Sequence, residues 1–170
     1  MKMTITEKEF IEFAYKATFS KDILLPFMSV VNKFKKNGTN VVFSDFRNHQ
    51  VIDLKSIKGS LDEGAAHSYA NNPWIDIVIE EGYIREDILP IYKQMLADPQ
   101  AYLDHYLGGV VLLEIGNAYF IMDGHKRLAL ARYFYEMLQM PTFLNDVKLF
   151  RCDPDWLESG FSEGSYLCFL

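Results

Sequence analysis

Five consecutive residues, Asp123 to Arg127, combine residue types that could hold an anion. With Asp123 as the N-cap of a helix, Gly124, His125, Lys126 and Arg127 would lie in its first turn. Acidic residues, worth roughly 0.3–1 kcal/mol each, are normally favoured there because free N–H groups and the positive helix pole accumulate. Three basic residues at this end therefore predict a bound anion. Gly124 would let a phosphate approach the backbone closely.

A second interpretation of the same five residues needs no ligand. Asp123 would be a helix cap, Gly124 a tight-turn residue, and Lys126 and Arg127 solvated side chains on an exposed face. Short motifs often match by chance, so the residues alone leave both interpretations open.

Other polar residues are weaker candidates for chemistry. The acidic pairs Asp62-Glu63 and Glu80-Glu81 could hold Mg²⁺ beside a nucleotide, because magnesium uses one or two carboxylates together with phosphate oxygens. Solvated charges on helix surfaces are the competing interpretation. The remaining histidines do not have metal-ligand spacing, so we predict no dedicated metal site. They are His49, His67 and His105.

The composition limits the classes of protein that need to be considered. The 170 residues, 49% of them hydrophobic, can bury the core of one domain, and a formal net charge of -6 makes nucleic acid an unexpected partner. No apolar run is long enough to cross a bilayer, and we expect a cytoplasmic protein. The single domain 1–170 is predicted to comprise an N-terminal helical layer (1–38), a core (40–150) and a packed irregular tail (151–170).

Hydrophobic periodicity predicts an α+β fold in which a small mixed sheet is flanked by helices. Thr6 and Glu9 form a capping-box pattern that predicts an N-terminal helix. Further helices are expected over 23–34, 61–69, 74–81, 87–107 in two pieces broken at Asp98-Pro99, and after Asp123. Strands are expected over 41–43, 50–54, 110–115, 118–122 and 143–150.

Two pairs of these strands look like hairpins. The stretch from Ser44 to His49 is rich in turn formers and would connect the first pair, while Gly116-Asn117 would connect the second.

The helix after Asp123 must position the candidate anion site. Its helical period predicts that one stripe of residues faces the core, namely Leu128, Ala131, Tyr135 and Leu138. The same period predicts that Lys126 and Arg132 reach solvent or ligand.

At this junction the chain resembles a known family. The segment Tyr119 to Ala131 looks like the strand, D-G-H-x-R turn and Ala-rich helix of ParB/sulfiredoxin-like proteins. Gln50 to Ile57 is similar to the family's opening strand, and Asp76 to Ile84 to its short helix. The resemblance covers about 41–150 and implies a ParB/sulfiredoxin-like core with an N-terminal helical extension. It also implies that Gly124 and Arg127 contact ligand phosphates, with Lys126 at a variable but often basic position.

The chain departs from this family at one informative position. His125 stands where ParB proteins usually have Glu and where sulfiredoxins have their catalytic Cys. The sulfiredoxin mechanism is therefore not expected, because it needs a thiol at that place. No helix-turn-helix segment follows the core, and 84–109 is an insertion relative to the compact family pattern.

Two hypotheses of function follow. In the first, the turn from Asp123 to Arg127 cradles the phosphates of ATP, another nucleotide or another small phosphorylated ligand. His125 and Glu81 would then be catalytic residues of a nucleotide-dependent phosphoryl-transfer enzyme, through proton transfer and Mg²⁺ respectively. In the second, the chain is a non-catalytic interaction or regulatory module that binds a protein partner or forms a homodimer.

Overall fold

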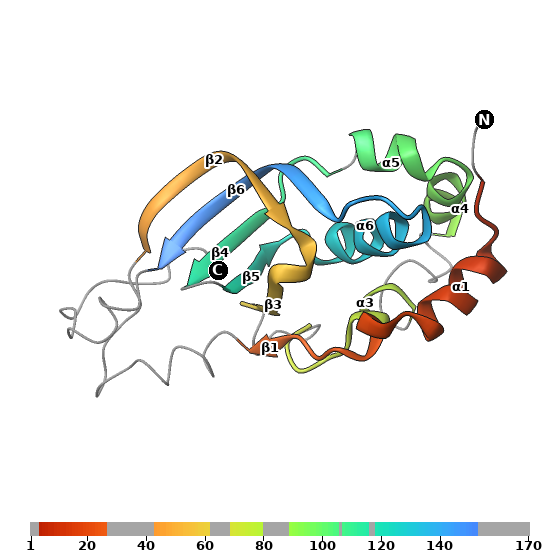
Figure 1. The fold of residues 1–170 in the computed structure, drawn as a ribbon, viewed down its shortest axis with the longest axis horizontal. Coiled ribbons are helices and arrows are strands. Elements are labelled where there is room, and N and C mark those ends of the chain that lie inside the picture. The colour runs from red at the N-terminus through yellow and green to blue at the C-terminus, as the bar shows by residue number, and fades with distance from the viewer. Residues whose placement is uncertain are drawn as a thin grey trace.

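The sheet of this protein places strands in an order far from their order in the chain. A computed structural model describes residues 4–26, 43–61, 69–79, 89–105, 107–115 and 118–152 (Figure 1). Within these ranges one mixed sheet has the order β1-β3-β5-β4-β6-β2. The strands are β1 (Leu25–Pro26), β2 (Phe43–Asp53), β3 (Ile57–Ser60), β4 (Val111–Ile115), β5 (Ala118–Asp123) and β6 (Phe143–Cys152).

The centre of the sheet is the predicted hairpin of β4 and β5. These strands pair antiparallel, from Val111 with Asp123 to Ile115 with Ala118. The connecting residues 116–117 lie outside the described ranges. β6 lies parallel to β4, and β3 lies parallel to β5 on the other side. The sheet is therefore mixed, which confirms the α+β fold class.

The first predicted hairpin is wrong. Ser44 to His49 does not turn the chain but continues β2 as one strand of 11 residues. This strand pairs antiparallel with β6, from Phe43 with Cys152 to Asp53 with Phe143, with shifts of register between. Pairing with a distant strand has overridden the local turn preference, and the irregularities accommodate residues that fit a regular ladder poorly.

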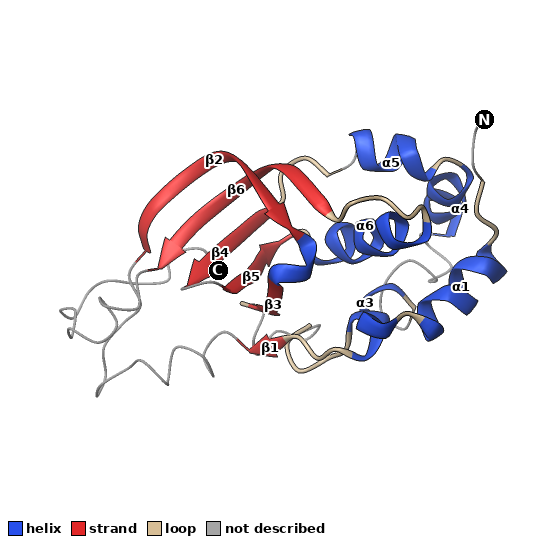
Figure 2. Ribbon diagram, viewed as in Figure 1, coloured by secondary structure: helices blue, strands red, loops and turns tan. Residues whose placement is uncertain are grey.

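The helices gather at one end of the sheet, around α6 (Figure 2). The break predicted at Asp98-Pro99 is confirmed, because it separates two helices there. The helices are α1 (Glu7–Lys16), α3 (Trp74–Val78), α4 (Leu89–Ala97), α5 (Pro99–His105) and α6 (His125–Met137), with 3₁₀ turns at Thr18–Lys21 and Leu54–Ser56. Over the described residues, none of the helices has the length and apolar character of a membrane span.

The predicted capping box of α1 is present. The Thr6 side chain accepts a hydrogen bond from the Glu9 backbone, and the Thr6 backbone N–H donates to the Glu9 carboxylate at 2.8 Å. Phe10 and Ala14 on the inner face of the helix are buried. The periodicity and the cap thus agree on where this helix lies.

The helix predicted over 23–34 is wrong in its described part. Leu24 exchanges backbone hydrogen bonds with Asn71 and Asn72, and Leu25–Pro26 pairs with β3. Tertiary backbone pairing therefore replaces the expected first turn. Residues 27–34, most of the helix predicted over 61–69 and the tail from 153 lie outside the described residues.

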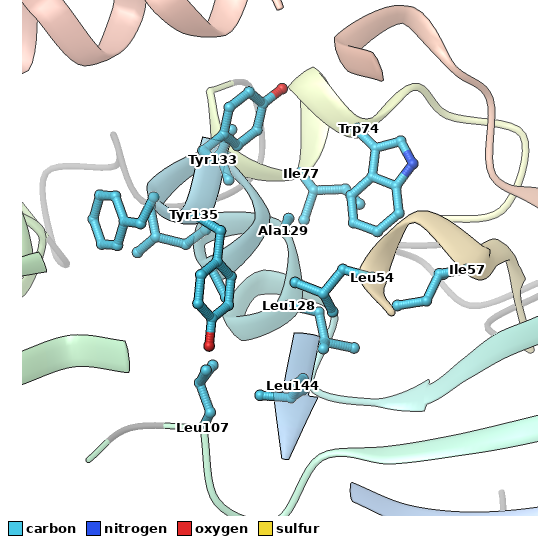
Figure 3. Close-up of a cluster of buried hydrophobic side chains, with 14 of the residues drawn as sticks. Leu54, Ile57, Trp74, Ile77, Leu107, Leu128, Ala129, Tyr133, Tyr135 and Leu144 are labelled. Atoms are coloured by element: carbon cyan, nitrogen blue, oxygen red, sulfur yellow. The ribbon is translucent and has the colours of Figure 1, made fainter. Parts of the chain in front are cut away.

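α6 is buried along most of its length. Figure 3 shows Leu128, Tyr133 and Tyr135 extending from different sides of this helix. Leu128, Ala131 and Tyr135 are buried as predicted, while Leu138 is partly buried.

The prediction that Arg132 reaches solvent or ligand is wrong, since its side chain is only 7% exposed. Its guanidinium carbon lies 4.1 Å from the ring centroid of Phe19 and 4.9 Å from that of Trp74. Because α1, α3 and the sheet enclose the helix, a polar residue on this side must pack against aromatic rings.

Candidate functional site

The junction between β5 and α6 is built on a left-handed glycine. Gly124 has a φ of 94° and is the N-cap of α6, so the prediction that Asp123 caps the helix is wrong. A Cβ at Gly124 would lie 3.0 Å from Cγ2 of Val110, a contact tighter than side chains normally adopt. Asp123 ends β5, and only Gly124 can then turn the chain directly into the helix at little steric cost.

Arg127 spans this junction. One end of its guanidinium donates to the carbonyl of Gly108, and the other lies 3.3 Å from Oδ2 of Asp123. The backbone carbonyl of Arg127 accepts a hydrogen bond from the Tyr102 hydroxyl at 3.1 Å. Its side chain remains about one third exposed, so a ligand could reach the guanidinium while these contacts fix its direction.

His125 is anchored rather than free to move. Its Nε2 lies 2.6 Å from Oγ of Ser60, the buried last residue of β3. The imidazole stacks on Tyr69, with ring centroids 4.9 Å apart. The ring is buried, so these contacts fix the first turn of α6 against the neighbouring strand.

These side chains surround a hollow at the N-terminal end of α6. The hollow has a volume of about 350 Å³ and is lined by Tyr69 and the five residues from Asp123 to Arg127. The first turn of α6 contains no acidic residue. The N-cap residue, Gly124, has no side chain that could accept hydrogen bonds from the N–H groups of this turn. Lys126 is partly exposed and has no ion-pair partner within the described residues. The geometry therefore gathers two cationic side chains at the positive end of a helix of 13 residues.

The other predicted candidates do not join this hollow. Glu81 and the pairs Asp62-Glu63 and Glu80-Glu81 lie outside the described residues, as does His67. His105 lies at the end of α5 and lines a different hollow. Within the described ranges no group of three or more His, Cys, Asp or Glu side chains could hold a metal ion.

Sequence reasoning missed three residues that shape the site: Ser60, Tyr69 and Gly108. Ser60 reads locally as the cap of a helix but ends β3 instead. None of the three is close to Asp123 in the sequence, so no spacing pattern connects them with it.

Comparisons with protein-family models, with curated proteins and with solved structures give no match.

Proposed function

We propose that this chain is a ParB/sulfiredoxin-like protein that binds a nucleotide or another phosphorylated ligand at the turn from Asp123 to Arg127. The observation that carries the proposal is the hollow at the N-terminal end of α6. Left-handed Gly124, Lys126 and Arg127 all line it, and no acidic side chain occupies the first turn of the helix. A phosphate there would receive the favourable charge that the helix end and the basic side chains provide.

Arg127 is the central phosphate-binding residue in this proposal. The Gly108 carbonyl holds one end of the guanidinium, while the Asp123 carboxylate approaches the other at the long distance of 3.3 Å. Asp123 is well exposed, so its pairing with Arg127 contributes little to stability. A phosphate could take the place of this carboxylate and use the planar edge of the guanidinium.

Two aromatic or basic rings suit a nucleotide better than a bare phosphate. Tyr69 lines the hollow beside the cations, and aromatic side chains are common stacking partners of nucleobases.

His125 would act first as a positioning residue, because its Nε2 is already engaged with Ser60. Phosphoryl transfer with His125 and Glu81 remains the catalytic form of the proposal. Asp123 could serve as a carboxylate ligand of nucleotide-bound Mg²⁺, which often needs only one or two carboxylates.

Thermal shift with ATP, ADP, CTP, GTP and phosphorylated metabolites, each with and without Mg²⁺, tests this function. A ligand present at about 100 times its Kd stabilises a protein by roughly 2.7 kcal/mol, which is readily measured. The response should disappear in Arg127→Ala and persist in Arg151→Ala. Arg151 is the control because it is another arginine in an ion pair, exposed on the sheet and 3.2 Å from the Glu114 carboxylate. Equal affinity of wild type and folded Arg127→Ala would refute the site.

The interaction module is the alternative, and one observation favours it. Leu25, on the edge strand β1, is 45% exposed, and Ile23, just before this strand, is 49% exposed, so a partner could cover both side chains. If no phosphorylated compound shifts the melting temperature, Ile23→Ser with Leu25→Ser becomes the decisive variant. Sedimentation of wild type and variant would then report a homodimer, which the substitutions should dissociate.

A further inference from the structure

The ion pair between Asp123 and Arg127 joins two residues that line the same hollow at the N-terminal end of α6. Arg127 Nη2 lies 3.3 Å from Asp123 Oδ2, while Nη1 donates to the carbonyl of Gly108. Nη2 belongs to both of the two-nitrogen edges with which a guanidinium can hold a phosphate. A phosphate bound bidentately by Arg127 would therefore compete with the Asp123 carboxylate for this nitrogen.

The two contacts of the Arg127 guanidinium differ in how easily they can be broken. Gly108 contributes a backbone carbonyl, whereas Asp123 contributes a side chain that is 68% exposed and can rotate into water. In the ion pair of Arg151, by contrast, the Glu114 side chain is only 13% exposed. The contact that can be given up is therefore the one with the Asp123 carboxylate, and the bond to Gly108 would keep the guanidinium in place.

Asp123 also supplies negative charge that the first turn of α6 lacks. This turn contains no acidic residue, and its N-cap, Gly124, has no side chain that could accept from the free N–H groups. A carboxylate just before the helix is attracted both by its positive end and by Arg127. In the empty site Asp123 therefore compensates the same positive charge that would attract the phosphate.

We propose that the ion pair between Asp123 and Arg127 is an autoinhibitory contact of the phosphate site. This inference rests on the proposed function, because it concerns the regulation of that site. The carboxylate must leave Arg127 before a phosphate can take Nη2, and it then lies in the same hollow as a group of like charge. Asp123 thus lowers the affinity for phosphate, and any change that neutralises or withdraws its carboxylate raises that affinity.

Isothermal titration of the full chain with sodium pyrophosphate tests this inference, because pyrophosphate carries the phosphate charge without a nucleoside. Asp123→Asn should bind it about fivefold more tightly than wild type, since an exposed ion pair no longer has to break. Asp123→Glu should bind it no more tightly than wild type, because the longer side chain still brings a carboxylate to the guanidinium.

Glu12→Gln is the matched control for the loss of one negative charge. Glu12 is also exposed and also belongs to an ion pair between residues four positions apart, with Lys8 on α1. This variant should bind pyrophosphate as wild type does. A gain in affinity in Glu12→Gln equal to that in Asp123→Asn would show a general effect of net charge and would overturn the inference.

Thermal unfolding distinguishes autoinhibition from simple damage to the turn. Without pyrophosphate, Asp123→Asn should unfold at a slightly lower temperature than wild type, because the N-terminal end of α6 loses its compensating charge. With pyrophosphate, the same variant should gain more in melting temperature than wild type. A merely structural role would lower stability and affinity together, whereas an autoinhibitory contact changes them in opposite directions.

Failure of this inference and failure of the proposed function give different results. If wild type binds pyrophosphate and folded Asp123→Asn binds it equally or more weakly, the autoinhibitory role is overturned and the phosphate site remains. Equally tight binding by Asp123→Glu and Asp123→Asn would overturn the role of the carboxylate in the same way. If neither wild type nor Asp123→Asn binds pyrophosphate, the phosphate site and the inference are both overturned.

Discussion

Ser60 Oγ and His125 Nε2 lie 2.6 Å apart and connect the end of β3 to the first turn of α6. Both residues are buried, so the hydrogen bond is shielded from water. This contact joins two segments that are 65 positions apart in the chain. It therefore fixes the N-terminal end of α6 more firmly than the local sequence could.

Ser60→Ala should destabilise the protein by about 1–3 kcal/mol, because a buried imidazole nitrogen loses its serine partner. The same variant should weaken the response to phosphorylated ligands, since the first turn of α6 is less well held. Urea denaturation and thermal shift measure the two effects. Ser56→Ala is the control, because Ser56 is a partly exposed serine of the adjacent 3₁₀ turn. Identical unfolding midpoints for the two variants would contradict the role assigned to Ser60.

Gly124→Ala should cost about 1–2 kcal/mol, because its left-handed φ of 94° disfavours any residue with a Cβ. The new methyl group would also crowd Val110, which shapes the turn of the candidate site. Gly108→Ala is a matched control on the same side of the molecule, since a Cβ there meets no atom within 4 Å. Chemical denaturation should separate the two variants clearly. Equal stability would mean that the turn tolerates a side chain.

Arg132→Lys should destabilise the protein by about 1–2 kcal/mol, because lysine cannot place a planar group against both Phe19 and Trp74. Burial lowers the pKa of the Arg132 guanidinium, and its Nε has no hydrogen-bond partner within the described residues. Arg132→Met should therefore be better tolerated than Arg132→Lys, since it leaves no buried charge. Urea midpoints of the two variants give the order. The reverse order would show that the positive charge itself is required.

The protein should lose stability in alkaline solution as Tyr133 ionises. Burial raises the pKa of the Tyr133 phenol from 10.0 to about 12, although the hydrogen bond with Ser20 lowers it. The unfolded chain therefore releases this proton at lower pH than the folded chain. The neutral Tyr133 phenol therefore contributes fully to the free energy of unfolding below pH 10.0, and this contribution is lost as pH rises toward about 12.

Urea denaturation across this alkaline range measures the loss. Tyr133→Phe should reduce its pH dependence but not abolish it, because burial also raises the pKa values of Tyr119 and Tyr135. An unchanged slope in Tyr133→Phe would exclude Tyr133 as a source.

The elements predicted correctly are those whose conformation is decided by residues close together in the sequence. The capping box of Thr6 and Glu9 defined the start of α1, and Asp98-Pro99 separated α4 from α5. The β4–β5 hairpin was recognisable because its strands are adjacent in the chain. For these elements a few neighbouring residues decide the conformation.

Elements that depend on distant partners were not predicted. β2 continues through Ser44 to His49 because β6 pairs with it, and Leu24 is extended because of backbone bonds to 71–72. The residues of the candidate site also fall into a part that is local in the sequence and a part that is distant. The motif from Asp123 to Arg127 was visible in the sequence, whereas Ser60 and Gly108 join it only through the fold.

The antiparallel pairing of β2 with β6 has a consequence for how the chain folds. Paired residues of these strands are roughly a hundred positions apart, and β4 also takes β6 as a neighbour. During synthesis β2 therefore cannot pair with β6 until residues 143–152 have left the ribosome, and until then the backbone groups that bond to β6 are unpaired. Ordering so long a loop before its contacts form slows folding, so refolding should be slow and its yield should fall with concentration.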